Sequence, residues 1–293
     1  MTSVKEFAFA KVNLYLDVLS RREDGFHDVK TVMHTVSLCD ELTVTVKPSS
    51  KREIKMLLEG NNKLPLDSRN LAYRAAELFL DATLNDAEVV IKLKKRIPVA
   101  AGLAGGSTDA AAVLRALNKA YKKPLTEKRL IELAATLGSD VPFCLIGGTA
   151  LCYGRGEKME RLPDTLKLAV VIAIADEYVS TPTAYAALDK IYANFTVDRK
   201  DGRDRLYEAL ISSLQTGIMH TEPLYNVFEN AIFPICSEAE KIKGKMIELG
   251  ATHALMSGSG PSVFGIFENM ADADRARSEL LSLGYRAYSA EST

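Results

Sequence analysis

The chain has 293 residues, 47% of them apolar, and its 37 Lys and Arg side chains nearly balance 38 Asp and Glu. This composition excludes a disordered chain, and the near-zero net charge argues against a protein that coats nucleic acid. The length favours two domains over one. The longest apolar run, residues 166–175, is too short to span a bilayer, and residues 1–7 lack the pattern of a secretory signal. We therefore expect a cytoplasmic protein without a membrane partner.

A strand is expected near the start of the chain. Residues 7–18 alternate with period two, which gives one unbroken apolar face from Ala8 to Val18. The other face is mixed and contains Lys11 and Asn13, two residues apart in sequence. The pattern predicts a strand with one face on a core and the other directed toward something partly polar.

The rest of the first half alternates strand and helix signals. Asn70 is expected to cap a helix that runs to about Thr83, and Thr126 is expected to cap another that Gly138 closes. A further helix is expected to begin at Ser107. Strands are expected over residues 29–38, 41–47, 88–97 and 145–153.

The second half follows a different order. A strand at 166–175 precedes a helix that opens at Thr181-Pro182. The later elements expected are a helix at 237–249, strands at 253–257 and 262–268, a helix at 271–283 and a strand at 285–290. With the strand at 166–175, this order is that of the β-α-β-β-α-β split motif. We expect an α+β fold with a boundary near Leu162-Pro163, giving domains 1–162 and 163–293.

The most specific segment is glycine-rich and covers residues 98–109, Pro-Val-Ala-Ala-Gly-Leu-Ala-Gly-Gly-Ser-Thr-Asp. Its glycines allow a ligand to approach the backbone, and the helix that follows offers unpaired N–H groups suited to phosphate. The segment lacks the lysine of a Walker A loop, and no Gly-x-Gly-x-x-Gly occurs in the chain. An ordinary strand-to-helix turn, with Ser107 or Thr108 as the N-cap, is the alternative.

A second glycine cluster joins two expected strands and contains Ser257, Gly258, Ser259 and Gly260. Alone it is typical of a long hairpin loop. Its hydroxyl and glycine content also suits the second wall of a phosphate pocket.

Two charged residues are candidates for chemistry. Lys11 shares a strand face with Phe9, Asn13 and Tyr15. A lysine on a solvated strand face is the usual alternative, but Phe9 and Tyr15 make this face only partly polar. Asp140 follows the end of an expected helix, where a turn aspartate is the alternative interpretation. The turn before His27 leaves that residue either in a plain loop or in contact with a base.

Four segments together resemble the GHMP kinases, a family that includes galactokinase, homoserine kinase and mevalonate kinase. They are residues 8–14, 98–112, 137–143 and 255–261. The peptides Asp24-Gly25-Phe26-His27 and Gly147-Gly148-Thr149-Ala150 resemble the members that phosphorylate a cytidine-diphosphate-linked methylerythritol in non-mevalonate isoprenoid biosynthesis. The resemblance runs from about Phe7 to the last strand.

The resemblance implies a ribosomal-S5-like N-terminal domain, a ferredoxin-like C-terminal domain and phosphoryl transfer from ATP with Mg²⁺ that gives a 2-phosphate. Asp140 would be the general base, and Lys11 would orient it and neutralise developing charge. Asn13, Phe26, His27 and Tyr185 would hold the acceptor. No side-chain ligand of the metal is assigned. The residues expected to bind ATP are Pro98, Val99, Ala100, Ala101, Gly102, Leu103, Ala104, Gly105, Gly106, Ser107 and Thr108.

Three residues depart from the family pattern. Ala104 stands where glycine is more frequent, Thr108 where serine is, and Phe26 where tyrosine is. The backbone loop, one hydroxyl and the aromatic ring are kept, so the mechanism remains possible. Partners are expected to be a small-molecule substrate and not nucleic acid, in a monomer or homodimer. Two alternatives stay open: a kinase similar to mevalonate or homoserine kinase, and a non-catalytic nucleotide- or RNA-binding module.

Overall fold

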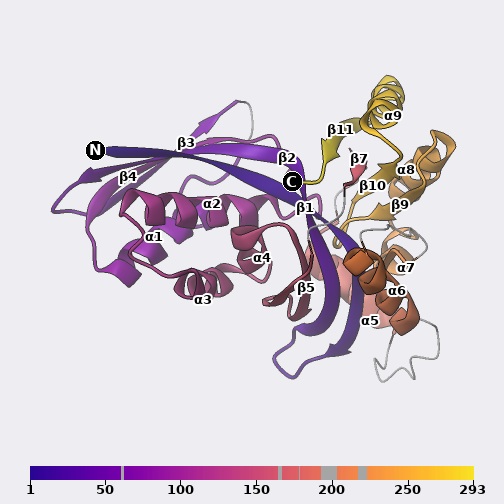
Figure 1. Cartoon of the computed structure of the whole chain (residues 1–293), viewed down its shortest axis with the longest axis horizontal. Coiled ribbons are helices and arrows are strands. Elements are labelled where there is room, and N and C mark those ends of the chain that lie inside the picture. Colours follow the sequence, from indigo (N-terminus) through magenta and orange to yellow (C-terminus); the bar gives the residue numbers. More distant parts are fainter. Residues whose placement is uncertain (61–62, 164–166, 178, 193–202, 217–222) are drawn as a thin grey trace. The chain divides into compact units, whose positions relative to one another are not determined.

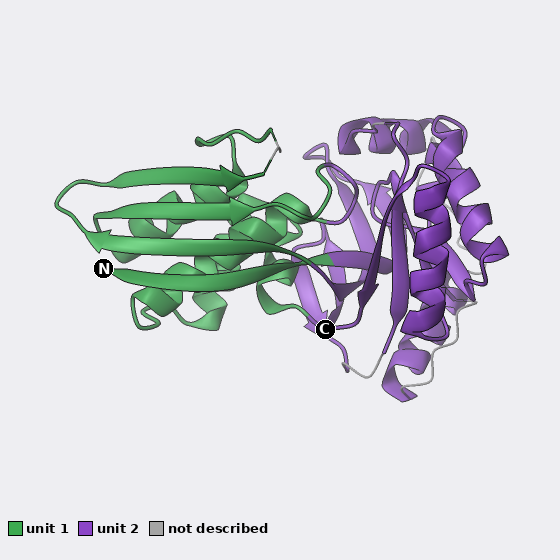
Figure 2. Cartoon of the chain, turned by 90° about the horizontal axis from the view of Figure 1, so that it is seen from above, with its two compact units in different colours: residues 1–10, 39–99, 104–147 green, residues 11–38, 100–103, 148–293 purple. Residues whose placement is uncertain are grey.

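The computed structural model describes residues 1–60, 63–163, 167–177, 179–192, 203–216 and 223–293 (Figure 1). The chain divides into two compact units, neither of which is one continuous stretch (Figure 2). Unit 1 contains residues 1–10, 39–99 and 104–147, and unit 2 contains residues 11–38, 100–103 and 148–293. The expected domain boundary near Leu162-Pro163 stays a prediction.

Unit 1 is built on a sheet in the order β3-β4-β2-β1. Its strands are β1 (Thr2–Arg21), β2 (His27–Pro48), β3 (Glu53–Glu59) and β4 (Ala87–Lys94), and the first two also run into unit 2. The expectation of two strands at 29–38 and 41–47 is wrong, because β2 is continuous. Residues 38–40, Leu-Cys-Asp, contain no glycine or proline that would interrupt the strand.

Four helices of unit 1 lie on one side of this sheet (Figure 1). They are α1 (Leu71–Thr83), α2 (Gly105–Ala120), α3 (Glu127–Leu137) and α4 (Val141–Ile146). The predicted caps of α1 and α3 are confirmed, since Asn70 accepts a hydrogen bond from the N–H of Ala72 and Thr126 accepts one from Arg129. Helix α2 is buried over most of its length, which its alanine-rich sequence permits by allowing close packing on α1.

Two boundaries in unit 1 differ from expectation. Helix α2 begins at Gly105 and not at Ser107, and neither Ser107 nor Thr108 is its N-cap. The hydroxyl of Thr108 donates instead to the carbonyl of Phe9, at 2.8 Å. The strand expected at 145–153 is also wrong in its first part, because Val141–Ile146 forms α4, with Pro142 in its first turn.

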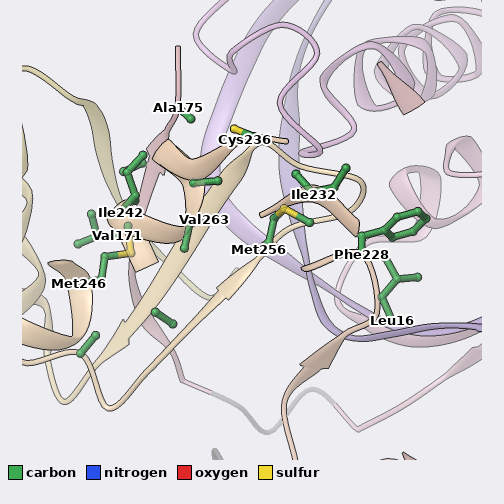
Figure 3. Packing of buried hydrophobic residues seen from close by; sticks show 14 of the residues in the cluster. Leu16, Val171, Ala175, Phe228, Ile232, Cys236, Ile242, Met246, Met256 and Val263 are labelled. Carbon is green, nitrogen blue, oxygen red and sulfur yellow. The ribbon is translucent and has the colours of Figure 1, made fainter. Parts of the chain in front are cut away.

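Unit 2 contains a four-stranded antiparallel sheet in the order β11-β7-β10-β9. The strands are β7 (Ala169–Ile174), β9 (His253–Met256), β10 (Ser262–Phe267) and β11 (Arg286–Glu291), and the helices α8 (Ser237–Glu248) and α9 (Met270–Ser282) connect them. Apart from four further elements between β7 and α8, the chain order is β7-α8-β9-β10-α9-β11, which confirms the expected split motif. Apolar side chains from this sheet and from α8 pack together, among them Val171, Val263, Ile242 and Met246 (Figure 3).

Unit 2 also contains the second half of β1, the first half of β2 and six further elements. They are β5 (Thr149–Gly154), β6 (Lys158–Arg161), α5 (Thr181–Ile191), α6 (Arg203–Thr216), β8 (Tyr225–Asn226) and α7 (Glu229–Ile232). Strand β5 pairs antiparallel with β2, and β8 pairs parallel with β1. In the part of the chain that the structure describes, no helix combines the length and apolar character needed to cross a membrane.

Candidate active site

Lys11 is buried in unit 2, with 4% of its surface exposed. Its ammonium donates to Asn13 Oδ1 at 2.6 Å and to the carbonyl of Gly102 at 2.8 Å. Asn13 is itself held by a hydrogen bond from its Nδ2 to Thr31 Oγ1. The alternative of a solvated strand lysine is therefore wrong. A buried ammonium with neutral acceptors is a favourable partner for an anion.

The glycine-rich segment has an unusual backbone. Ala100, Gly102 and Ala104 have φ angles of 55°, 75° and 57°, all in the left-handed region. At Gly102 a Cβ atom would lie 2.1 Å from the carbonyl oxygen of Ser257. Only glycine fits that position, so this glycine serves a close approach of two backbone segments and not only a turn.

The second glycine cluster is the segment that approaches Gly102 in unit 2. Ser257 Oγ donates to the Gly102 carbonyl at 3.1 Å, and Ser262 Oγ donates to the carbonyl of Ala101. A Cβ atom at Gly258 would lie 2.9 Å from the Gly102 carbonyl oxygen. The two glycine clusters thus contact each other, as a shared phosphate pocket requires, while phosphate binding itself stays a prediction.

Asn226 supports the second glycine cluster and was missed by the sequence analysis. Its Nδ2 donates to the carbonyls of Met256 at 2.7 Å and Gly258 at 2.8 Å, and its Oδ1 accepts from the N–H of Phe228. Asn226 lies on the two-residue strand β8, which is too short to show periodicity. No local pattern could have identified it.

A buried charge cluster lies beside the start of α2 in unit 1. Lys95 Nζ lies 2.5 Å from Asp40 Oδ2 and 2.6 Å from Asp109 Oδ2, and it donates to the carbonyl of Gly105 at 2.9 Å. Burial and the nearby charge of Asp40 raise the pKa of Asp109 well above its usual range, against the opposing effect of the Lys95 charge. None of these three charged residues was predicted from the sequence.

Asp140 lies in unit 1, at the N-cap position of α4. It is half-buried, and its side chain makes no capping hydrogen bond. The carboxylate is therefore not committed to stabilising its own helix. Lys11 belongs to unit 2, so the pairing of these two residues stays a prediction.

The residues expected to hold the acceptor lie in unit 2. The rings of His27 and Tyr185 are stacked, with centroids 4.7 Å apart and planes inclined by 26°. His27 Nε2 also lies 2.7 Å from Asp189 Oδ1. Asp189 was missed, although it follows Tyr185 by four residues on α5 and thus shares its helix face. Phe26 is 54% exposed, and the guanidinium of Arg155 lies 5.0 Å from the centre of its ring.

Comparison with known proteins supports this picture at the level of the family. Residues 70–148 match the family described as GHMP kinases N terminal domain, and residues 206–286 match GHMP kinases C terminal. A 4-diphosphocytidyl-2-C-methyl-D-erythritol kinase of Exiguobacterium sibiricum is 45% identical over 266 residues, 91% of this chain and 90% of its own length. The enzyme of that name from Caldicellulosiruptor saccharolyticus is 41% identical over 275 residues, 93% of this chain and 91% of its own length.

A solved structure agrees with the two family matches and the two relatives. The crystal structure of a 4-(cytidine 5'-diphospho)-2C-methyl-D-erythritol kinase superposes with a TM-score of 0.80 at 37% identity, covering 98% of each chain. The two family matches and this similarity confirm the expected two-domain kinase fold with α+β class. The chain therefore belongs to the GHMP kinase family of phosphotransferases, alongside the 4-diphosphocytidyl-2-C-methyl-D-erythritol kinases.

Proposed function

We propose that the chain transfers the terminal phosphoryl group of ATP to a hydroxyl of 4-diphosphocytidyl-2-C-methyl-D-erythritol, giving the 2-phosphate, in non-mevalonate isoprenoid precursor biosynthesis. The observation that carries the chemistry is the buried ammonium of Lys11 on the Gly102 carbonyl. It places a fixed positive charge on the backbone of the segment expected to hold phosphates. The choice of acceptor is supported by relatives of that name at 41% and 45% identity.

Phosphoryl transfer depends on positioning and charge neutralisation more than on covalent chemistry. In the proposed mechanism the N–H groups at the start of α2 and the backbone of residues 98–108 bind the phosphates of ATP. Lys11 neutralises charge that develops on the transferred group. Asp140 accepts the proton of the acceptor hydroxyl as the new oxygen–phosphorus bond forms. Its lack of a capping role leaves the carboxylate available for this task.

Mg²⁺ is proposed to accompany ATP. The described residues contain no group of three or more His, Cys, Asp or Glu side chains that could hold a metal ion. Thr108 directs its hydroxyl to Phe9, whereas Ser107 is only half-buried in the first turn of α2. Phosphate oxygens, water and the Ser107 hydroxyl fit the oxygen preference of the ion. When bound, Mg²⁺ supplies charge neutralisation on the triphosphate.

The acceptor is proposed to bind against Asn13, Phe26, His27 and Tyr185. The stacked rings of His27 and Tyr185 and the exposed ring of Phe26 supply flat surfaces suited to a pyrimidine base. Asn13 lies beside Lys11 and can orient the hydroxyl to be phosphorylated. The proposed setting is the cytoplasm, with the chain acting as a monomer or homodimer.

A coupled ADP-release assay tests the proposal. Purified protein with ATP and Mg²⁺ is offered the cytidyl-methylerythritol, mevalonate and homoserine in parallel. We expect turnover with the cytidyl compound alone. Turnover of mevalonate or homoserine without turnover of the cytidyl compound would refute the acceptor and favour another GHMP kinase. Tight, salt-sensitive RNA binding without ATP turnover would favour the non-catalytic module.

A further inference from the structure

The cluster of Asp40, Lys95 and Asp109 holds the two ends of the glycine-rich loop, residues 98–104. Before the loop, Asp40 Oδ1 accepts hydrogen bonds from the N–H groups of Arg96 at 2.5 Å and Ile97 at 2.8 Å. After the loop, Lys95 donates to the carbonyl of Gly105, the first residue of α2. The ammonium joins both ends through the contact of Lys95 with Asp40.

Little space remains around these contacts. A Cβ atom at Gly105 would lie 3.1 Å from Lys95 Nζ and 3.1 Å from Cγ2 of Ile97. The side chains of Lys95, Asp40 and Asp109 are only 3%, 0% and 3% exposed. Buried hydrogen bonds to charged groups are strong, and their loss leaves an unpaired buried charge. The cluster therefore fixes the backbone at residues 96–97 and 105 more rigidly than a surface ion pair would.

We propose that Asp40, Lys95 and Asp109 are positioning residues that clamp the two ends of the glycine-rich loop. This assignment rests on the proposed binding of ATP by that loop. Loss of the ammonium frees the two ends from each other. Freed ends weaken ATP binding, and the change does not act directly on the acceptor.

The first test is Lys95→Met. We expect the KM for ATP to rise by about tenfold or more, equivalent to at least about 1.4 kcal/mol, with the KM for the acceptor within about twofold of the wild-type value. An ATP KM equal to that of the wild type in a folded variant overturns the proposal. Because this variant leaves two buried carboxylates without a cation, it can fail to fold, and a second variant is needed.

The second test is Asp109→Asn, in which a neutral amide keeps the shape of the carboxyl but loses the charged contact with Lys95. We expect the KM for ATP to rise by about threefold or more and the KM for the acceptor to stay within about twofold of the wild-type value. An unchanged ATP KM in this folded variant overturns the proposal.

Glu6→Gln is the matched control. Glu6 is also buried in unit 1 and pairs with Arg115 and Lys119, toward the other end of α2. The variant should lower Tm while leaving the ATP KM as in the wild type. Calorimetric titration of ADP into the wild type separates the two proposals: absence of binding refutes the ATP loop itself, whereas binding that is equal in wild type and Lys95→Met refutes only the clamp.

Discussion

The ammonium of Lys11 donates a hydrogen bond to the backbone carbonyl of Gly102, over 2.8 Å. This hydrogen bond joins a strand residue to a loop residue that is 91 positions away in sequence. A lysine ammonium has three N–H groups, and acceptors within the described residues account for two of them. The third N–H group can donate a hydrogen bond to a transferred phosphoryl group. The position of the charge is thus set by the same loop that is proposed to hold ATP.

Replacement of Lys11 by methionine should lower kcat by about 10²- to 10³-fold, the usual cost of losing one charge stabiliser of a transition state. The ATP KM should change less, because the loop also keeps its contacts with Ser257 and Ser262. Steady-state kinetics at saturating acceptor measure both constants. Lys11→Arg should not restore activity, since a planar guanidinium cannot occupy the site of a compact ammonium. A Lys11→Met enzyme with normal kcat would remove Lys11 from the chemistry.

Asp140→Asn tests the proposed base. We expect kcat to fall by about 10²- to 10⁴-fold, because the amide cannot accept the hydroxyl proton. ADP binding and Tm should stay close to wild type, since the carboxylate does not cap α4. Asp274→Asn, a substitution of an exposed aspartate on α9, is the control for the loss of one charge. Near-normal turnover in Asp140→Asn would show that another group takes the proton.

Local sequence signals predicted the elements that depend on neighbours in the chain. The alternation of residue types through β1 extends over neighbouring residues, and the caps at Asn70 and Thr126 bond to residues two or three positions later. Such local features can be recognised in a single sequence. The order of strands and helices in the second half was also sufficient to identify the split motif. Apolar periodicity and capping residues are the strongest signals that a single sequence offers.

The parts that could not be predicted depend on contacts between distant segments. Lys95 meets Asp40 across 55 positions of sequence, and Asn226 meets Met256 across 30. Nothing near Lys95 distinguishes it from the neighbouring Lys94 and Arg96, because only the fold buries its side chain. The sequence predicted that Gly102 lets a ligand approach the backbone. In the structure, a Cβ atom at this position would instead meet the backbone carbonyl oxygen of Ser257.

Gly102→Ala should weaken both the fold and ATP binding. The added methyl group would lie 2.1 Å from a backbone carbonyl, and the φ of 75° disfavours any other residue by about 1–2 kcal/mol. We expect a lower Tm and a higher ATP KM. Gly244→Ala is the opposite case, because no atom lies within 4 Å of the added Cβ on the exposed face of α8. That variant should gain about 0.5–1 kcal/mol of unfolding free energy. Equal Tm changes in the two variants would contradict the close approach at Gly102.

His253 should make unit 2 less stable in mild acid. Burial and the charge of Lys243 lower the pKa of its imidazole, and its Nε2 has no hydrogen-bond partner among the described residues. The unfolded chain, with a histidine pKa of about 6.5, then binds a proton more readily than the folded one. The contribution of His253 to the free energy of unfolding is therefore constant above about pH 6.5. The free energy of unfolding decreases as pH falls from there toward the folded pKa. Urea unfolding at pH 7.5 and pH 5 should show a smaller loss in His253→Gln than in the wild type. An identical loss in both would exclude His253 as the cause.

Ala104→Gly should stabilise the protein without nucleotide. Ala104 adopts a φ of 57° at the N-cap of α2, where an L-residue with a Cβ is disfavoured by about 1–2 kcal/mol. Glycine removes this strain but costs about 0.5–1 kcal/mol in the entropy of the unfolded chain, so the expected net gain is about 0.5–1 kcal/mol. Ala110→Gly, within the same helix, is the control and should lose about 1 kcal/mol or more because it adds flexibility without relieving strain. Urea unfolding of both variants distinguishes the two effects. Destabilisation of Ala104→Gly comparable to that of Ala110→Gly would mean that the left-handed conformation at residue 104 is not strained in the folded protein.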